Sequence, residues 1–161
     1  MIKILTTGGT IEGLDYVDDK GIKKTNISIG DFFDRANVDF EYDIESIFKK
    51  DSRAIDEDDL KLLVSKVREA NSKKILITHG TFTMEATAKY LGKLKLGKTI
   101  VLVGSFILGA SENTDAPFNL GYAISSLQFL KPDVYIAMNG QVFHWNNVSK
   151  NVEANKFERN E

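Results

Sequence analysis

Residues 2–10 read Ile-Lys-Ile-Leu-Thr-Thr-Gly-Gly-Thr, and this stretch decides the fold. A short apolar run leads directly into two glycines and a hydroxyl residue. Residues 74–81 and 99–105 repeat the pattern, with a glycine followed by Thr81 in one and by Ser105 in the other. Ligands of open α/β sheets bind outside the carboxyl ends of the strands. We therefore expect these hydroxyl residues to share one rim of a parallel sheet.

The rest of the chain alternates between strand and helix patterns. Apolar side chains recur at helical spacing in the predicted helices, and Ser28, Asp56 and Asp115 precede three of them, Asp56 and Asp115 as caps. Helices are expected at residues 29–35, 56–70, 84–94 and 117–130, and strands at 2–6, 38–48, 74–78, 99–103 and 134–138. This order predicts one α/β domain over residues 1–161, a three-layer, Rossmann-like fold with a mostly parallel sheet and helices on both faces.

The composition excludes several classes of protein. The 161 residues are 42% apolar and 27% charged, and the net charge of −2 lacks the basic patch that nucleic acid requires. There is no cysteine, which suits a reducing cytoplasm, and the first apolar run is too short for a signal peptide. Because no apolar run approaches ~18 residues, no membrane span is expected. We predict a cytoplasmic protein without a nucleic-acid or membrane partner.

Two segments are poor in apolar residues. Residues 13–26 are expected to form a mobile loop that orders as a lid over Thr10. The tail, residues 151–161, is polar, and its last residues are expected to be loosely held.

Three common site types fit the sequence poorly. The dinucleotide fingerprint needs a middle glycine where Thr10 stands, and no Gly-Lys-Ser/Thr triplet provides a phosphate loop. The two histidines, His79 and His144, are far apart and lack metal-ligand spacing, so no metal or cofactor is expected. His79 is interpreted as hydrogen-bonded structure. Gly104-Ser105 is not followed by the glycine that a serine-hydrolase turn requires.

The remaining candidate is nucleophilic catalysis by a side-chain hydroxyl group. Thr10 follows a strand and two glycines, which allow the backbone to turn sharply and expose the hydroxyl. A threonine hydroxyl needs a base or a cationic neighbour before it attacks at neutral pH. The residues alone are equally compatible with Thr10 as a plain turn residue.

Several stretches resemble the bacterial-type L-asparaginases. Residues 6–12, Thr-Thr-Gly-Gly-Thr-Ile-Glu, resemble the first signature of that family. Residues 79–85, His-Gly-Thr-Phe-Thr-Met-Glu, resemble the second signature. Residues 51–55, 111–120 and 138–150 are similar to further family stretches in the same order. The resemblance covers nearly the whole chain.

This resemblance implies a hydrolase that acts on a small carboxamide, asparagine or a relative, and releases ammonia. Thr10 matches the acylated nucleophile, Thr81 and Lys150 match the supporting pair, and Tyr16 lies in the loop that carries a mobile tyrosine. Ser52 matches a residue that holds the substrate's carboxylate. The residues expected to contact the substrate are Gly9, Ser52, Arg53, Gly80, Phe82 and Ser105.

Two departures from the family pattern bear on function. The chain is about half as long as the two-domain enzymes, so we expect a short single-domain form that assembles as a homo-oligomer. Phe82 stands where the family has an aspartate. A catalytically impaired homologue that binds a small ligand, or serves as a partner subunit, is the alternative function. A further alternative is that Phe82 packs in the core while Asp15 or Asp115 supplies the carboxylate.

Overall fold

The structure is a computed structural model that describes residues 1–14 and 27–160. Residues 15–26 and 161 lie outside the described part. The expected lid falls mostly in this undescribed segment, as do Tyr16 and Asp15.

Six strands form one sheet in the order β2-β1-β3-β4-β5-β6. The first five are parallel, and β6 returns antiparallel beside β5. Their bounds are β1 (Ile2–Gly8), β2 (Tyr42–Lys50), β3 (Lys74–Thr78), β4 (Thr99–Val103), β5 (Val134–Met138) and β6 (Gln141–His144). The predicted, mostly parallel sheet is confirmed.

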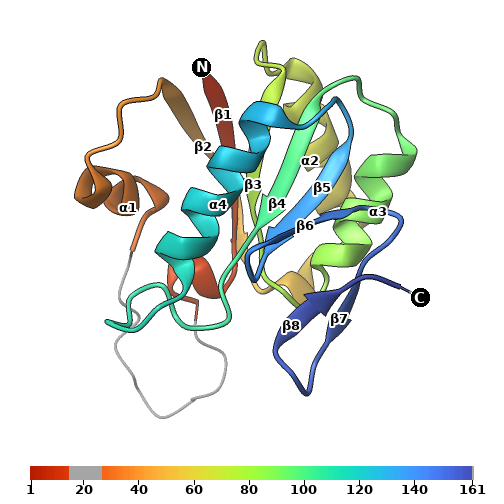
Figure 1. Cartoon of the computed structure of the whole chain (residues 1–161). Helices are drawn as coiled ribbons and strands as arrows, with labels where there is room; N and C mark the ends of the chain where they lie inside the picture. The colour runs from red at the N-terminus through yellow and green to blue at the C-terminus, as the bar shows by residue number, and fades with distance from the viewer. Residues whose placement is uncertain (15–26, 161) are drawn as a thin grey trace.

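Helices cover both faces of this sheet. They are α1 (Ile29–Ala36), α2 (Glu57–Glu69), α3 (Met84–Lys93) and α4 (Ala116–Phe129). In Figure 1, α4 crosses the front of the sheet and α2 lies behind it. Both faces of the inner strands are therefore covered, and the apolar side chains of β3 and β4 are fully buried. This is why these strands read as uninterrupted apolar runs rather than alternating ones.

The strand order fixes where a site can form. The chain leaves β1 for β2 on one side and later returns to β3 on the other side of β1. Loops that diverge in this way leave a crevice at the carboxyl ends of the two neighbouring strands, the switch point of an open α/β sheet. The turns after β1 and β3 carry Thr10 and Thr81 to this crevice.

Two of the three polar residues that precede helices cap them with their side chains, and the third does not. Ser28 and Asp56 each accept backbone N–H groups in a reciprocal capping box. Asp115 occupies the N-cap position of α4, but its carboxylate makes no cap bond. It accepts the N–H groups of Phe106 and Ile107 instead, because the loop after β4 folds back over it. The prediction of Asp115 as a side-chain cap is therefore wrong.

The strand predicted at residues 38–48 begins later, at Tyr42. Phe40 and Tyr42 pack edge-on against Phe33 of α1, with ring centroids 5.5 and 5.0 Å away. The apolar alternation before Tyr42 thus reflects this aromatic cluster, which forms before the chain enters the sheet.

The polar tail forms a hairpin of β7 (Ser149–Asn151) and β8 (Lys156–Glu158). Phe157 is buried, and its ring packs against Phe143 of β6 and Phe106 of the loop after β4. Only the last residues of the tail are expected to be loosely held, and β8 before them is fixed because one aromatic side chain anchors it. The hairpin also places Lys150 beside the turn after β3.

Candidate active site

The turns after β1 and β3 meet at two glycines. Gly9 has a φ of +82°, and a Cβ at this position would lie 2.6 Å from the backbone nitrogen of Gly80. A Cβ on Gly80 would in turn lie 2.8 Å from the Ser52 hydroxyl oxygen. Only glycine allows backbones to approach this closely. The close approach brings the residues that follow, Thr10 and Thr81, to the same junction as Ser52.

A small pocket lies at this junction. Its walls combine backbone, hydroxyl groups, one carboxylate and one aromatic ring, from Gly9, Thr10, Asp51, Ser52, Gly80, Thr81 and Phe82. Arg53 and Ser105 are not among the lining residues. The Ser105 hydroxyl donates to the Ile107 carbonyl at 2.7 Å, within its own turn. The structure thus gathers most of the predicted site residues in one pocket, and Ser105 lies apart from them.

Lys150 reaches this pocket from the β7–β8 hairpin. Its Nζ donates to the Thr81 hydroxyl oxygen at 2.9 Å, and its backbone N–H donates to the Glu85 carboxylate at 2.9 Å. Burial lowers the pKa of Lys150, because removal of water disfavours the charged ammonium. A lysine of this kind holds its neutral, basic form at a lower pH than a free lysine does. The Lys150–Thr81 pair therefore has the chemistry of a base and a hydroxyl that relays a proton.

Phe82 forms the rim of the pocket rather than part of the core. Its side chain is 55% exposed, so the alternative in which it packs beneath α3 is wrong. Two cationic groups lie near its ring: Lys150 Nζ is 4.2 Å from the centroid and the Arg53 guanidinium carbon is 4.5 Å from it. Arg53 also pairs with Asp51, and these hydrogen bonds lower the pKa of the Asp51 carboxyl. Of the two carboxylates proposed to replace the missing aspartate, Asp115 is bound to its own loop.

His79 is a structural residue. Its ring is fully buried, Nδ1 donates to the Gly80 carbonyl at 2.7 Å, and Nε2 lies 2.9 Å from the Thr87 hydroxyl oxygen. Burial lowers the pKa of His79 to about 4, so the ring is neutral at physiological pH. Its hydrogen bonds hold the turn before Thr81 in place, in agreement with the interpretation from the sequence.

Glu12 was not identified as a site residue by sequence reasoning. Its carboxylate lies behind Thr10, is almost completely buried, and accepts the Gly8 N–H at 2.6 Å. Burial raises the pKa of Glu12, and the Gly8 hydrogen bond opposes part of that shift. A lone acidic residue in a three-residue turn has no periodicity that would reveal its burial.

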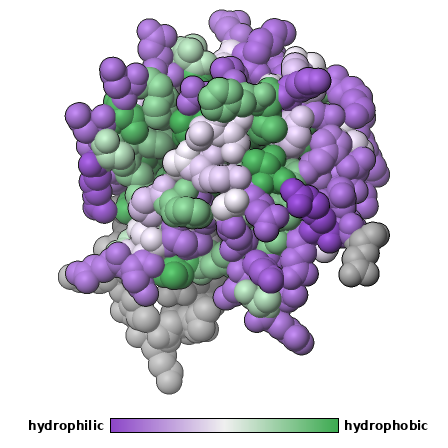
Figure 2. Space-filling view, in the orientation of Figure 1, coloured by the Kyte–Doolittle hydropathy of each residue, from purple (hydrophilic) through white to green (hydrophobic). Residues whose placement is uncertain are grey.

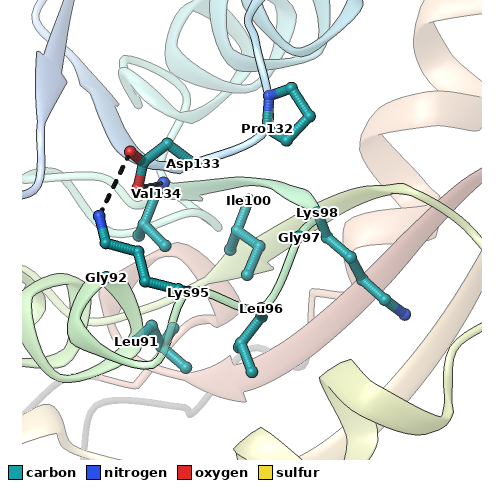
Figure 3. A pocket seen from close by; sticks show the side chains of 10 residues that line it. All are labelled: Leu91, Gly92, Lys95, Leu96, Gly97, Lys98, Ile100, Pro132, Asp133 and Val134. Carbon is teal, nitrogen blue, oxygen red and sulfur yellow. Dashed lines mark hydrogen bonds and ion pairs between the residues drawn. The ribbon is translucent and has the colours of Figure 1, made fainter.

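A different hollow lies at the end of the molecule where β4 and β5 begin, and Figure 3 shows its lining. Asp133 and Lys95 form an ion pair of 3.8 Å there, and Asp133 also binds His144 and Trp145. These contacts join loops at the end of the sheet opposite Thr10. Within residues 1–14 and 27–160, no set of three His, Cys, Asp or Glu side chains is placed to hold a metal ion. None of the helices described there is long and apolar enough to cross a membrane.

The fold and the site together define a doubly wound α/β domain with hydroxyl groups and a lysine at its switch point. The sequence profile of the family described as "Asparaginase, N-terminal" matches residues 1–159, and the chain therefore belongs to the asparaginase family.

Individual relatives agree with this assignment. The glutaminase-asparaginase of Pseudomonas fluorescens biotype A is 32% identical, over 92% of this chain and 45% of its own length. L-asparaginase 2 of Escherichia coli K12 is also 32% identical, over 92% of this chain and 46% of its own. The structure of the thermostable L-asparaginase from Thermococcus kodakarensis matches with a TM-score of 0.83 and 28% identity, over 98% of this chain and 50% of that one. The chain thus spans about half the length of these relatives.

Proposed function

We propose that this protein hydrolyses a small carboxamide, asparagine or a related amide, through an acyl intermediate on Thr10 and releases ammonia. The observation that carries the proposal is the 2.9 Å contact between Lys150 Nζ and the Thr81 hydroxyl, in a pocket that Thr10 also lines. A base, a relay hydroxyl and a second hydroxyl at one switch point are the parts that nucleophilic acyl transfer needs.

The reaction has two halves. The Thr10 hydroxyl oxygen attacks the amide carbon and loses its proton, and the tetrahedral intermediate expels ammonia, which carries that proton away. Water then attacks the resulting ester, and the Thr81–Lys150 pair accepts its proton. Collapse breaks the ester bond, returns a proton to Thr10 and releases the carboxylic acid. Backbone N–H groups of the glycine turns near Thr10 and Thr81 are suited to stabilise the oxyanion in both halves.

The substrate contacts follow from the residues that line the pocket. The family resemblance implies that Ser52 holds a carboxylate of the substrate, and we expect Gly9 and Gly80 to allow the substrate to approach the backbone closely. The absence of cysteine suits the cytoplasm, where we place the protein.

A ligand-binding module without turnover is the second candidate, and Phe82 is the observation that favours it. An exposed ring beside two cations offers a stacking surface but no group that moves a proton. Loss of a pocket carboxylate is compatible with loss of turnover and retention of binding.

One assay separates the two functions. Wild type and Thr10→Val are incubated with asparagine and glutamine, ammonia is measured, and ligand binding is followed by calorimetry. The enzyme proposal predicts ammonia release by the wild type and none by Thr10→Val at an equal melting temperature, because valine and threonine have similar shapes. Binding of ligand with no ammonia from either protein would favour the module. Full activity of Thr10→Val would overturn the assignment of the nucleophile.

A further inference from the structure

The parallel ladder between β1 and β2 breaks just before Thr10. Thr6 pairs with Ser46, but Gly8, two residues later, pairs with Lys50, so β2 bulges by two residues at this point. The Gly9 N–H donates to the Lys50 carbonyl at 3.1 Å, whereas the Gly8 N–H donates to the carboxylate of Glu12 at 2.6 Å. Glu12 therefore replaces the neighbouring strand as the partner of the last N–H group of β1.

This bond closes a small ring around Thr10. Glu12 lies four residues after Gly8, and Thr10 stands midway between them in the short helix Thr10–Glu12. The backbone adds two bonds in the same turn, from the Glu12 N–H to the Gly9 carbonyl and from the Gly13 N–H to the Thr10 carbonyl. Gly8 and Gly9 both have positive φ, which glycine adopts readily but does not enforce, so these hydrogen bonds rather than side-chain sterics hold the turn.

The same carboxylate reaches the neighbouring strand. The Thr78 hydroxyl at the end of β3 lies 3.4 Å from the Glu12 oxygen that accepts the Gly8 N–H. The carboxylate thus joins the turn of Thr10 to both strands that form the crevice. When the carboxylate is ionised these bonds are charge-assisted and stronger than neutral ones, so ionisation strengthens this link.

We propose that Glu12 is a positioning residue, whose buried carboxylate clamps the Gly8 N–H and so holds the Thr10 turn in the geometry that reaction requires. The inference rests on the proposed function of Thr10. Burial raises the pKa of Glu12, because removal of water disfavours the ionised carboxylate, and groups perturbed in this way cluster at functional sites. Lys49 of β2 is the cation whose field stabilises the ionised form, and Asp31 of α1 lines the same hollow as Glu12 and Lys49.

The first test uses the Gly8 amide as a reporter that needs no turnover. In ¹⁵N-labelled wild-type protein, we expect the Gly8 amide resonance to move with pH as Glu12 ionises, with a midpoint above the ordinary glutamate pKa of 4.5. In Glu12→Gln the movement should vanish, because the amide oxygen still accepts the bond but does not titrate. Glu41→Gln, an exposed change directly before the start of β2, should leave the movement intact. A Gly8 resonance that does not move in the wild type, or moves equally in Glu12→Gln, contradicts the proposal that the Glu12 carboxylate holds the Gly8 N–H.

The second test uses kinetics. Glu12→Gln should keep kcat within ~3-fold of wild type, while Glu12→Ala should lose ~10-fold or more in kcat with KM nearly unchanged, because a misplaced nucleophile slows the reaction step rather than binding. A folded Glu12→Ala protein with wild-type kcat overturns the positioning role. If the wild type releases no ammonia but its Gly8 amide titrates as expected, the proposed function is wrong, while the bond between Glu12 and the Gly8 N–H is supported.

Discussion

The ammonium nitrogen of Lys150 lies 2.9 Å from the hydroxyl oxygen of Thr81, although 69 residues separate them in the sequence. The contact exists because the β7–β8 hairpin is anchored by Phe157 and turns Lys150 toward the carboxyl end of β3. It brings a lysine amine from a distant part of the sequence to a residue that lines the Thr10 pocket.

Lys150 should govern how activity depends on pH. In the proposed mechanism the neutral amine acts as the base, and burial lowers the pKa of Lys150, so activity should rise with pH and reach its plateau below the pH at which a free lysine loses its proton. Lys150→Met should lower kcat by ~10²-fold or more. Lys156→Met, on the exposed side of the same hairpin, is the matched control. Equal losses in the two variants, measured by ammonia release from pH 5 to pH 10, would remove Lys150 from the mechanism.

Phe82→Asp should increase the turnover of free asparagine. A carboxylate at this position faces Arg53 and Lys150 and can pair with the α-ammonium of the substrate, whereas the ring cannot. We expect kcat/KM for asparagine to rise ~10-fold or more, because one charge-assisted hydrogen bond contributes about 1.5–3 kcal/mol. The wild type should prefer amides that lack a free α-amine.

The same variant should also shift the pH profile. A nearby carboxylate raises the pKa of Lys150, so the rise in activity should move to higher pH. Leu62→Asp, an exposed change on α2, controls for added surface charge. A folded Phe82→Asp protein with unchanged asparagine turnover would contradict the idea that the lost carboxylate limits this site.

The contact between Gly9 and Gly80 predicts a selective loss of stability. Gly9 and Gly97 both have positive φ, but a Cβ on Gly97 meets nothing within 4 Å, whereas one on Gly9 meets the Gly80 backbone. Gly97→Ala should cost ~1 kcal/mol of unfolding free energy from backbone strain. Gly9→Ala should cost at least ~2 kcal/mol more, because backbone cannot move aside as a side chain can. Urea unfolding of both variants measures the difference in unfolding free energy. Equal losses would mean that the turns at Gly9 and Gly80 do not constrain each other.

The surface predicts self-association. Figure 2 shows apolar side chains among polar ones on the face that α4 crosses, and Phe118 and Phe129 of that helix are 62% and 84% exposed. The aromatic rim at Phe82 adds a further exposed apolar group. Contiguous apolar patches mark interfaces, so these side chains are the candidate contacts of the expected assembly. We expect a homodimer or a larger assembly in analytical ultracentrifugation, and a monomer at micromolar concentration would contradict it.

The inner sheet could be predicted because its signal is local. Strands such as β3 and β4 are short apolar runs, and Asp56 caps α2 in a capping box that the sequence displays. The start of β2 was predicted too early because alternation reports which side chains pack and not which partner they pack against. The β7–β8 hairpin was missed because a single aromatic residue, Phe157, anchors an otherwise polar segment.

The site residues that could be predicted from the sequence are those that come directly after the ends of strands. Thr10 and Thr81 come directly after glycine turns, so their meeting follows from the topology of a parallel sheet. The role of Phe82 as an exposed rim depends on the direction of one side chain, which the sequence leaves open. Glu12 depends on a break in strand pairing that only the register of β1 and β2 reveals.

The acyl-Thr10 intermediate is the central claim, and mass spectrometry of acid-quenched protein tests it most directly. Wild-type protein is mixed with an amide that it turns over, quenched within milliseconds to seconds, and digested. We predict that the mass of the acyl group, the substrate without its ammonia, appears on the peptide that contains Thr10 and is absent in Thr10→Val. An acyl group on another residue, or ammonia release without any covalent adduct on Thr10 at any quench time, would contradict the mechanism.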